Sequence, residues 1–72
     1  MEQATAIRLR VNGEARELPA GTTVSALLEG IGLAARKVAV ERNEEIVPRT
    51  LYATTVLAEG DAVEIVHFIG GG

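Results

Sequence analysis

The fold is decided by residues 7–18, which read IRLRVNGEAREL. Apolar and charged side chains alternate over the first five positions, so the apolar ones share one face of a strand and the two arginines share the wet face. Asn12-Gly13 follows, and both residues tolerate the positive φ angles of a type I′ turn. The chain is therefore predicted to return as a second strand over 14–18 and to form a β-hairpin.

A short amphipathic helix is predicted after the hairpin. Its apolar residues recur at i, i+3, i+4 and i+7, which is one stripe of a helix: Val24, Leu27, Leu28 and Ile31. The Thr23 hydroxyl is expected to cap the first amides, and Gly30 and Gly32 are expected to end the helix.

Three further strands are predicted over residues 37–41, 45–47 and 62–69. Arg42-Asn43-Glu44 is expected to turn the chain between the first two, and Pro48 indicates that the 45–47 strand lies at a sheet edge. The stretch 49–57 is expected to be irregular, with one helical turn. Three of its apolar residues are expected to close one end of the core: Leu51, Val56 and Leu57.

The order of these elements is hairpin, helix, then three strands. If the last strand lies beside the first and parallel to it, the sheet wraps around the single helix. The predicted class is therefore α+β, with a mixed five-stranded sheet in the β-grasp, or ubiquitin-like, arrangement. Residues 1–72 are expected to form one domain, with a C-terminal glycine tail over 70–72.

The composition excludes several kinds of protein. The chain has 72 residues, of which 47% are hydrophobic and 24% charged, with a net charge of −3 and no cysteine. Disulfides, thiolate metal sites and a cysteine nucleophile are therefore excluded, and the acidic balance argues against a nucleic-acid partner. Neither a basic signal-peptide start nor a membrane-length apolar run is present. We expect a cytoplasmic protein that is a monomer alone.

Residues for conventional catalysis are scarce. His67 is the single histidine, and its parity with Val63 and Ile65 places it on the inward face, where a structural role is favoured over that of a general base. No metal-ligand cluster and no Ser/His/Asp set can be assembled. The aromatic residues, Tyr52 and Phe68, are too few for a base-stacking platform. We expect no metal site and no enzymatic activity of its own.

The last strand carries an apolar outer face. If Val63 and Ile65 point into the core, Glu64, Val66 and Phe68 point outward. Exposed apolar side chains favour a covering partner, and aromatic residues are enriched at interface centres. We therefore predict partner binding by these three residues, with Phe68 as the anchor. The alternative is that the loop around Tyr52 folds over Phe68.

The sequence closes on Gly70-Gly71-Gly72. Three glycines cannot pack a core, and they form a thin lead that bears the α-carboxylate of Gly72. Such an end suits insertion into the active site of another protein, because no Cβ collides with a narrow channel.

Three segments together resemble the ThiS sulfur carriers of thiamin biosynthesis. The first is Val11-Asn12-Gly13-Glu14 with Gly21-Thr22-Thr23-Val24 and Leu27-Leu28. The second is Val38 to Asn43 with Ile46-Val47-Pro48-Arg49, and the third is Gly60-Asp61 with 63–66 and the glycine end. The resemblance spans Ile7 to Gly72, with a few extra residues before it and a third glycine, which leaves Gly71-Gly72 as the functional pair.

The resemblance implies a carrier that binds no cofactor. A ThiF-type enzyme would use ATP and Mg²⁺ to adenylate Gly72, a persulfide sulfur donor would convert it to a thiocarboxylate, and the thiazole synthase ThiG would accept the sulfur. Two alternatives stay open. One is another sulfur carrier, such as the small subunit of molybdopterin synthase; the other is a β-grasp interaction module that never reacts.

Overall fold

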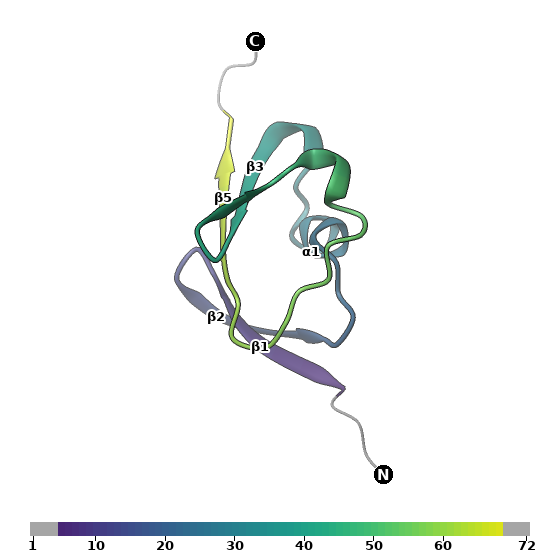
Figure 1. Cartoon of the computed structure of the whole chain (residues 1–72), viewed down its shortest axis with the longest axis vertical. Helices are drawn as coiled ribbons and strands as arrows, with labels where there is room; N and C mark the ends of the chain where they lie inside the picture. The colour runs from purple at the N-terminus through teal and green to yellow at the C-terminus, as the bar shows by residue number, and fades with distance from the viewer. Residues whose placement is uncertain (1–4, 69–72) are drawn as a thin grey trace.

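The structure is a computed structural model that describes residues 5–68. Its strands are β1 (Ala6–Val11), β2 (Glu14–Pro19), β3 (Val38–Arg42), β4 (Glu45–Val47) and β5 (Ala62–His67). The helix α1 (Val24–Ile31) follows β2, and two 3₁₀ turns, η1 (Ala35–Lys37) and η2 (Arg49–Leu51), precede β3 and follow β4. Figure 1 shows α1 on one side of the sheet, with the chain after η2 passing beside it to the start of β5.

The five strands form one mixed sheet in the order β2-β1-β5-β3-β4. β1 and β5 are parallel, whereas the other three neighbouring pairs are antiparallel. The predicted β-grasp arrangement is confirmed, and β4, which Pro48 follows, lies at an edge as expected. β5 is the central strand in this order, with β1 beside its first two residues and β3 beside the rest.

Two tight turns set the register of the sheet. Asn12 and Gly13 have φ angles of 52° and 83°, as the type I′ turn requires. Asn43 and Glu44 also have positive φ angles, of 52° and 72°, so β3 and β4 are joined by a turn of the same kind. In both turns an asparagine takes the first left-handed position, which it tolerates better than most residues.

The core lies between the sheet and α1. The helix buries Val24, Leu27 and Leu28, and Ile31 packs at the margin, so the predicted stripe is confirmed. The sheet contributes the inward residues of its strands: Ile7, Leu9, Val11, Val38, Val40, Val47, Val63 and Ile65. Burying a side chain of this size stabilises the fold by about 1.5–3 kcal/mol before the cost of ordering it.

The ends of α1 follow from local chemistry. The Thr23 hydroxyl accepts a hydrogen bond from the Ala26 N–H at 3.1 Å, which confirms the predicted cap. The helix ends at Gly32, whose φ of 83° is the left-handed conformation that glycine favours. Gly30, which we expected to help end the helix, lies within it.

The segment between β4 and β5 differs from the prediction. Leu57 is buried as expected, but Leu51 and Val56 are 48% and 51% exposed, so their assignment to the core was wrong. Tyr52 takes that position, with its ring buried and its hydroxyl donating to the Val38 carbonyl at 3.3 Å. The segment has no periodicity, and its path is set by backbone bonds to α1, such as Val24 N–H to the Thr55 carbonyl at 3.0 Å.

Candidate functional site

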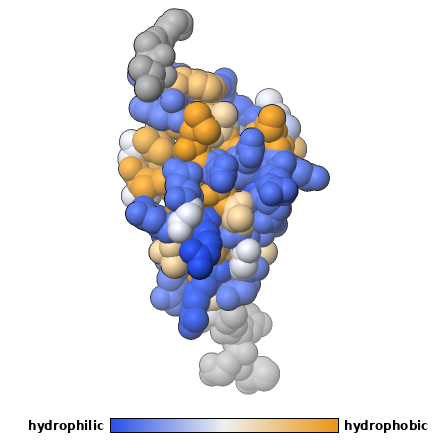
Figure 2. Space-filling model, turned by 90° about the vertical axis from the view of Figure 1, so that its left-hand side faces the viewer, coloured by the Kyte–Doolittle hydropathy of each residue, from blue (hydrophilic) through white to orange (hydrophobic). Residues whose placement is uncertain are grey.

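The outer face of β5 is apolar near the end of the described chain. Val63 and Ile65 point into the core, whereas Val66 and Phe68 point outward and are 59% and 51% exposed. This confirms the predicted alternation. Figure 2 views the molecule from the left-hand side of Figure 1, and apolar side chains gather in the half toward which β5 runs.

A further exposed apolar side chain belongs to the same face. Ile46 on β4 is 73% exposed, and the strand register places it beside Glu41, which in turn is opposite Glu64 on β5. The sequence held a signal for it, because Val47 faces inward and its strand neighbour must then face outward. We call Ile46, Glu64, Val66 and Phe68 the outer patch.

The loop around Tyr52 does not cover Phe68. Tyr52 points into the core and donates to the Val38 carbonyl, on the opposite side of the sheet from the outer patch. The backbone N–H of Phe68 donates to the Lys37 carbonyl at 2.8 Å, so this residue is still held against the sheet. The alternative that we left open for Phe68 is therefore wrong.

His67 lies on the expected side of β5 but is not buried. It lines an open hollow together with Ile65, Ile31 and Leu33. The strand extends beyond the part of the sheet that α1 covers, so parity gives the direction of the side chain but not its burial. A lone exposed imidazole of this kind has no carboxylate or nucleophile partner among residues 5–68.

Asp61 is the one buried charged residue among the described positions, and the sequence analysis noted it only within the Gly60-Asp61 segment of the resemblance. Its carboxylate accepts hydrogen bonds from Arg42 Nε at 2.8 Å, Asn43 Nδ2 at 3.0 Å and the Ala58 N–H at 2.8 Å. Burial alone raises the pKa of Asp61, but the bonds from Asn43, Ala58 and Arg42 outweigh it and hold the pKa below its ordinary value. Asp61 thus ties the β3–β4 turn to the start of β5.

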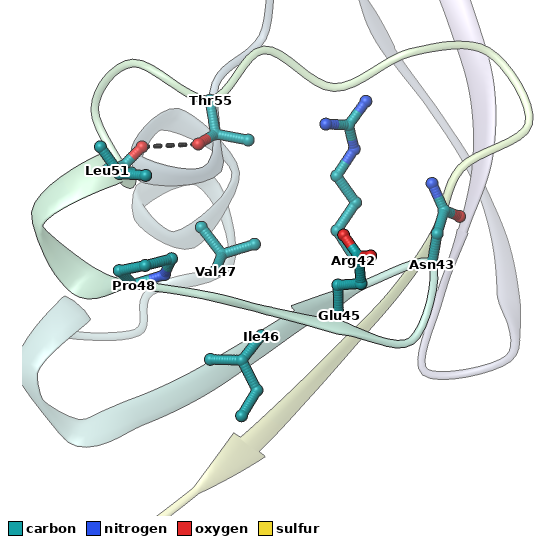
Figure 3. A pocket seen from close by; sticks show the side chains of 8 residues that line it. All are labelled: Arg42, Asn43, Glu45, Ile46, Val47, Pro48, Leu51 and Thr55. Carbon is teal, nitrogen blue, oxygen red and sulfur yellow. Dashed lines mark hydrogen bonds between the residues drawn. The ribbon is translucent and has the colours of Figure 1, made fainter.

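A second hollow, of about 380 Å³, lies between β4 and the segment that follows it (Figure 3). Arg42 and Asn43 line it, but both donate to Asp61, and the Thr55 hydroxyl donates to the Leu51 carbonyl at 2.7 Å. Figure 3 shows Ile46 directed away from Val47, toward the opposite side of β4. The hollow therefore offers no assembled catalytic set.

Other kinds of site are not found in the described part of the chain. Residues 5–68 hold no group of three or more His, Cys, Asp or Glu side chains that could bind a metal ion. Across the same residues, no helix is both long enough and apolar enough to cross a membrane. The predicted carrier tail, Gly70, Gly71 and Gly72, lies outside the described residues.

Comparisons with known proteins agree on one family. The model of the ThiS family matches residues 9–72. The sulfur carrier protein ThiS of Bacillus subtilis is 40% identical over 65 residues, which cover 89% of this chain and 98% of that protein. A crystal structure of the thiamine biosynthesis protein ThiS from Geobacter metallireducens superposes with a TM-score of 0.78 at 36% identity, and covers 92% of this chain and 100% of that one.

A second kind of relative is much longer. A thiazole synthase from Magnetococcus marinus is 52% identical over 66 residues, which cover 92% of this chain. The chain spans 20% of the length of that thiazole synthase.

Proposed function

Because this chain belongs to the ThiS family of sulfur carrier proteins, we propose that it carries sulfur for thiamine biosynthesis on the acyl group of Gly72. The observation that carries the proposal is the family match, which covers residues 9–72 and so includes Gly72. The central place of β5 supports it, because the strand that precedes the tail is anchored in the middle of the sheet.

Activation of Gly72 requires a partner enzyme. A carboxylate is a poor electrophile, because resonance and negative charge both oppose attack by a nucleophile. In the proposed reaction, a Gly72 carboxylate oxygen attacks the α-phosphorus of ATP on a ThiF-type enzyme with Mg²⁺, and pyrophosphate leaves. The resulting mixed anhydride with AMP removes both obstacles. The carrier itself supplies the acyl group and no catalytic side chain.

Sulfur then replaces the adenylate. The terminal sulfur of a cysteine persulfide attacks the Gly72 acyl carbon and AMP leaves, which gives an acyl disulfide. A thiolate then attacks the sulfur of the donor cysteine, forms a new disulfide with it and releases the thiocarboxylate on the carrier. A thiocarboxylate is anionic and nucleophilic at neutral pH. It can deliver sulfur to an acceptor without release of free sulfide.

The proposed acceptor is a thiazole synthase of the ThiG type. The support is the thiazole synthase of Magnetococcus marinus, part of which is 52% identical to this chain. In that thiazole synthase, a region similar to this chain belongs to the same polypeptide as the rest of the protein, which is consistent with a carrier and a synthase that act together.

The outer patch is the proposed docking surface for these enzymes. Val66 and Phe68 immediately precede the tail in sequence, and Ile46 extends the apolar area across the sheet. Binding energy from a rigid surface can offset the cost of ordering a tail in a narrow active site. Glu64, on the same face, would favour a basic group on the partner.

Intact mass spectrometry tests the function. The protein is incubated with the ThiF-type enzyme, ATP, Mg²⁺, a persulfide donor and a thiol reductant, and each component is omitted in turn. We expect a mass gain that corresponds to the exchange of one oxygen for sulfur at Gly72, and only in the complete mixture. The proposal is refuted if the mass stays unchanged, or if protein from the native host continues beyond Gly72 unprocessed.

A further inference from the structure

β5 is supported unequally on its two sides. β1 pairs with it at two positions only, Arg10 with Ala62 and Val11 with Val63, because the chain then turns away. On the other side, β3 pairs with β5 as far as His67. Beyond Val63, therefore, β5 has a strand neighbour on one side alone within the described residues (Figure 1).

The side chain of Asn12 takes the place of the missing strand. Its backbone N–H donates to the Val63 carbonyl at 2.8 Å. Its side-chain Oδ1 accepts from the Ile65 N–H at 2.7 Å, and its Nδ2 donates to the Ile65 carbonyl at 3.3 Å. One amide side chain thus forms the donor and acceptor bonds that a paired strand residue would form.

Asn12 is the last such contact on this side of β5. Past Ile65 lies the open hollow of about 410 Å³, whose lining includes Glu14, Arg16, Leu33 and His67. Within residues 5–68, no side-chain hydrogen bond reaches the backbone of His67. The direction in which β5 leaves the sheet therefore depends on β3 from one side and on Asn12 from the other.

We propose that Asn12 is a positioning residue for the reaction at Gly72: by closing the free edge of β5 at Ile65, it fixes the path along which the strand presents the tail relative to the outer patch. The inference rests on the proposed function and concerns the same reacting group. The physical basis is that the domain docks as a rigid body, so the direction of β5 decides whether Gly72 reaches the correct place in the partner's active site. A displacement of about 1 Å can cost on the order of 100-fold in rate.

The chain offers a matched control in Asn43. It also has a φ of 52°, at the first position of the β3–β4 turn. Its Oδ1 accepts from the Ala62 N–H at 2.9 Å, its backbone N–H donates to the Ala62 carbonyl at 2.7 Å, and its Nδ2 donates to Asp61. Asn43 therefore holds Ala62, at the beginning of β5, by the same chemistry with which Asn12 holds Ile65 farther along the strand.

The test compares Asn12→Gly with Asn43→Gly in the full-length chain. Glycine tolerates the positive φ and keeps the backbone N–H bond in both turns, so each variant loses only the side-chain amide. Both are assayed, at a temperature at which both are folded, for ATP–pyrophosphate exchange by the ThiF-type enzyme with Mg²⁺. Amide hydrogen exchange is measured in parallel at Phe68, whose N–H donates to the Lys37 carbonyl beyond Ile65.

We expect Asn12→Gly to lower kcat/KM for the carrier by about tenfold and to speed amide hydrogen exchange at Phe68. Asn43→Gly should have a lower Tm than wild type, but its kcat/KM should stay within roughly twofold of the wild-type value. Equal kcat/KM values in the two variants, or amide hydrogen exchange at Phe68 that Asn12→Gly leaves unchanged, would overturn the positioning role. If the wild-type protein supports no ATP–pyrophosphate exchange, the proposed function is refuted, and with it the reaction that Asn12 is proposed to serve.

Discussion

Neutralising the buried carboxylate of Asp61 should destabilise the whole domain. In Asp61→Asn, the side chain keeps its size and one acceptor oxygen, but its NH₂ group replaces either the oxygen that accepts from Arg42 and Ala58 or the oxygen that accepts from Asn43. Hydrogen bonds to a charged group contribute about 1.5–3 kcal/mol each, and a donor left without a partner costs about 1–3 kcal/mol.

We expect the loss of unfolding free energy in Asp61→Asn to lie near the lower end of these values. The Arg42 side chain is 32% exposed, so water can replace part of what it loses. We therefore expect a loss of about 2 kcal/mol, against roughly 3–5 kcal/mol for the core of a domain of this size. For such a domain, this loss lowers Tm by about 8–16 °C.

The pH dependence identifies the charge as the cause. The pKa of Asp61 in the folded protein lies below its ordinary value of 3.8. The stabilisation is therefore fully present above pH 3.8 and is lost as the pH falls through the lower, folded pKa. The difference in unfolding free energy between wild type and Asp61→Asn should be constant near neutral pH and shrink below about pH 4.

Urea unfolding at several pH values measures this difference. Glu44→Gln is the matched control, because Glu44 is exposed and its carboxylate forms no hydrogen bond among residues 5–68; its effect should stay within about 0.5 kcal/mol. If the difference in unfolding free energy between wild type and Asp61→Asn does not change with pH, the shape of the side chain rather than its charge accounts for the difference. A loss of unfolding free energy no larger than that of Glu44→Gln would refute the role of Asp61 in joining the β3–β4 turn to the start of β5.

Three further outcomes follow from burial and from the proposed chemistry. Phe68→Ala should change the unfolding free energy by no more than about 0.5 kcal/mol, because the side chain is half exposed; it should weaken binding of the ThiF-type enzyme by roughly tenfold, as measured by calorimetry, and a large loss of stability with normal affinity would mean that Phe68 belongs to the core. Leu28→Ala should cost about 2–5 kcal/mol in urea unfolding, because this fully buried residue leaves a cavity between α1 and the sheet; near-native stability would contradict the described packing. Gly71→Val should abolish adenylation with no loss of Tm, and undiminished ATP–pyrophosphate exchange would refute the need for a bare chain end.

The pattern of the sequence was sufficient where structure is local. The alternation in 7–18 and the helical stripe after Thr23 report which side chains face the core, because strands and helices repeat every 2 and about 3.6 residues. The turn at Asn12-Gly13 also follows from φ preferences that each residue carries with it. The outward direction of Val66 and Phe68 was predicted for the same reason.

Contacts distant in the sequence were not accessible in this way. Tyr52 replaces Leu51 and Val56 in the core because the segment after β4 is held by backbone bonds to α1, which leave no periodic trace. The burial of Asp61 depends on two donors, Asn43 and Arg42, that lie 18 and 19 positions earlier in the chain.

The sequence by itself determined the elements, their inward faces and the family, because each depends on residues close together in the chain or on the match over 9–72. Only the tertiary structure decided that Asn12, 53 positions before Ile65, completes the edge of β5. The same holds for Ile46, which joins the outer patch through strand register. Strand pairing brings such residues together without leaving a pattern in either segment, so their roles become visible only once the sheet is assembled.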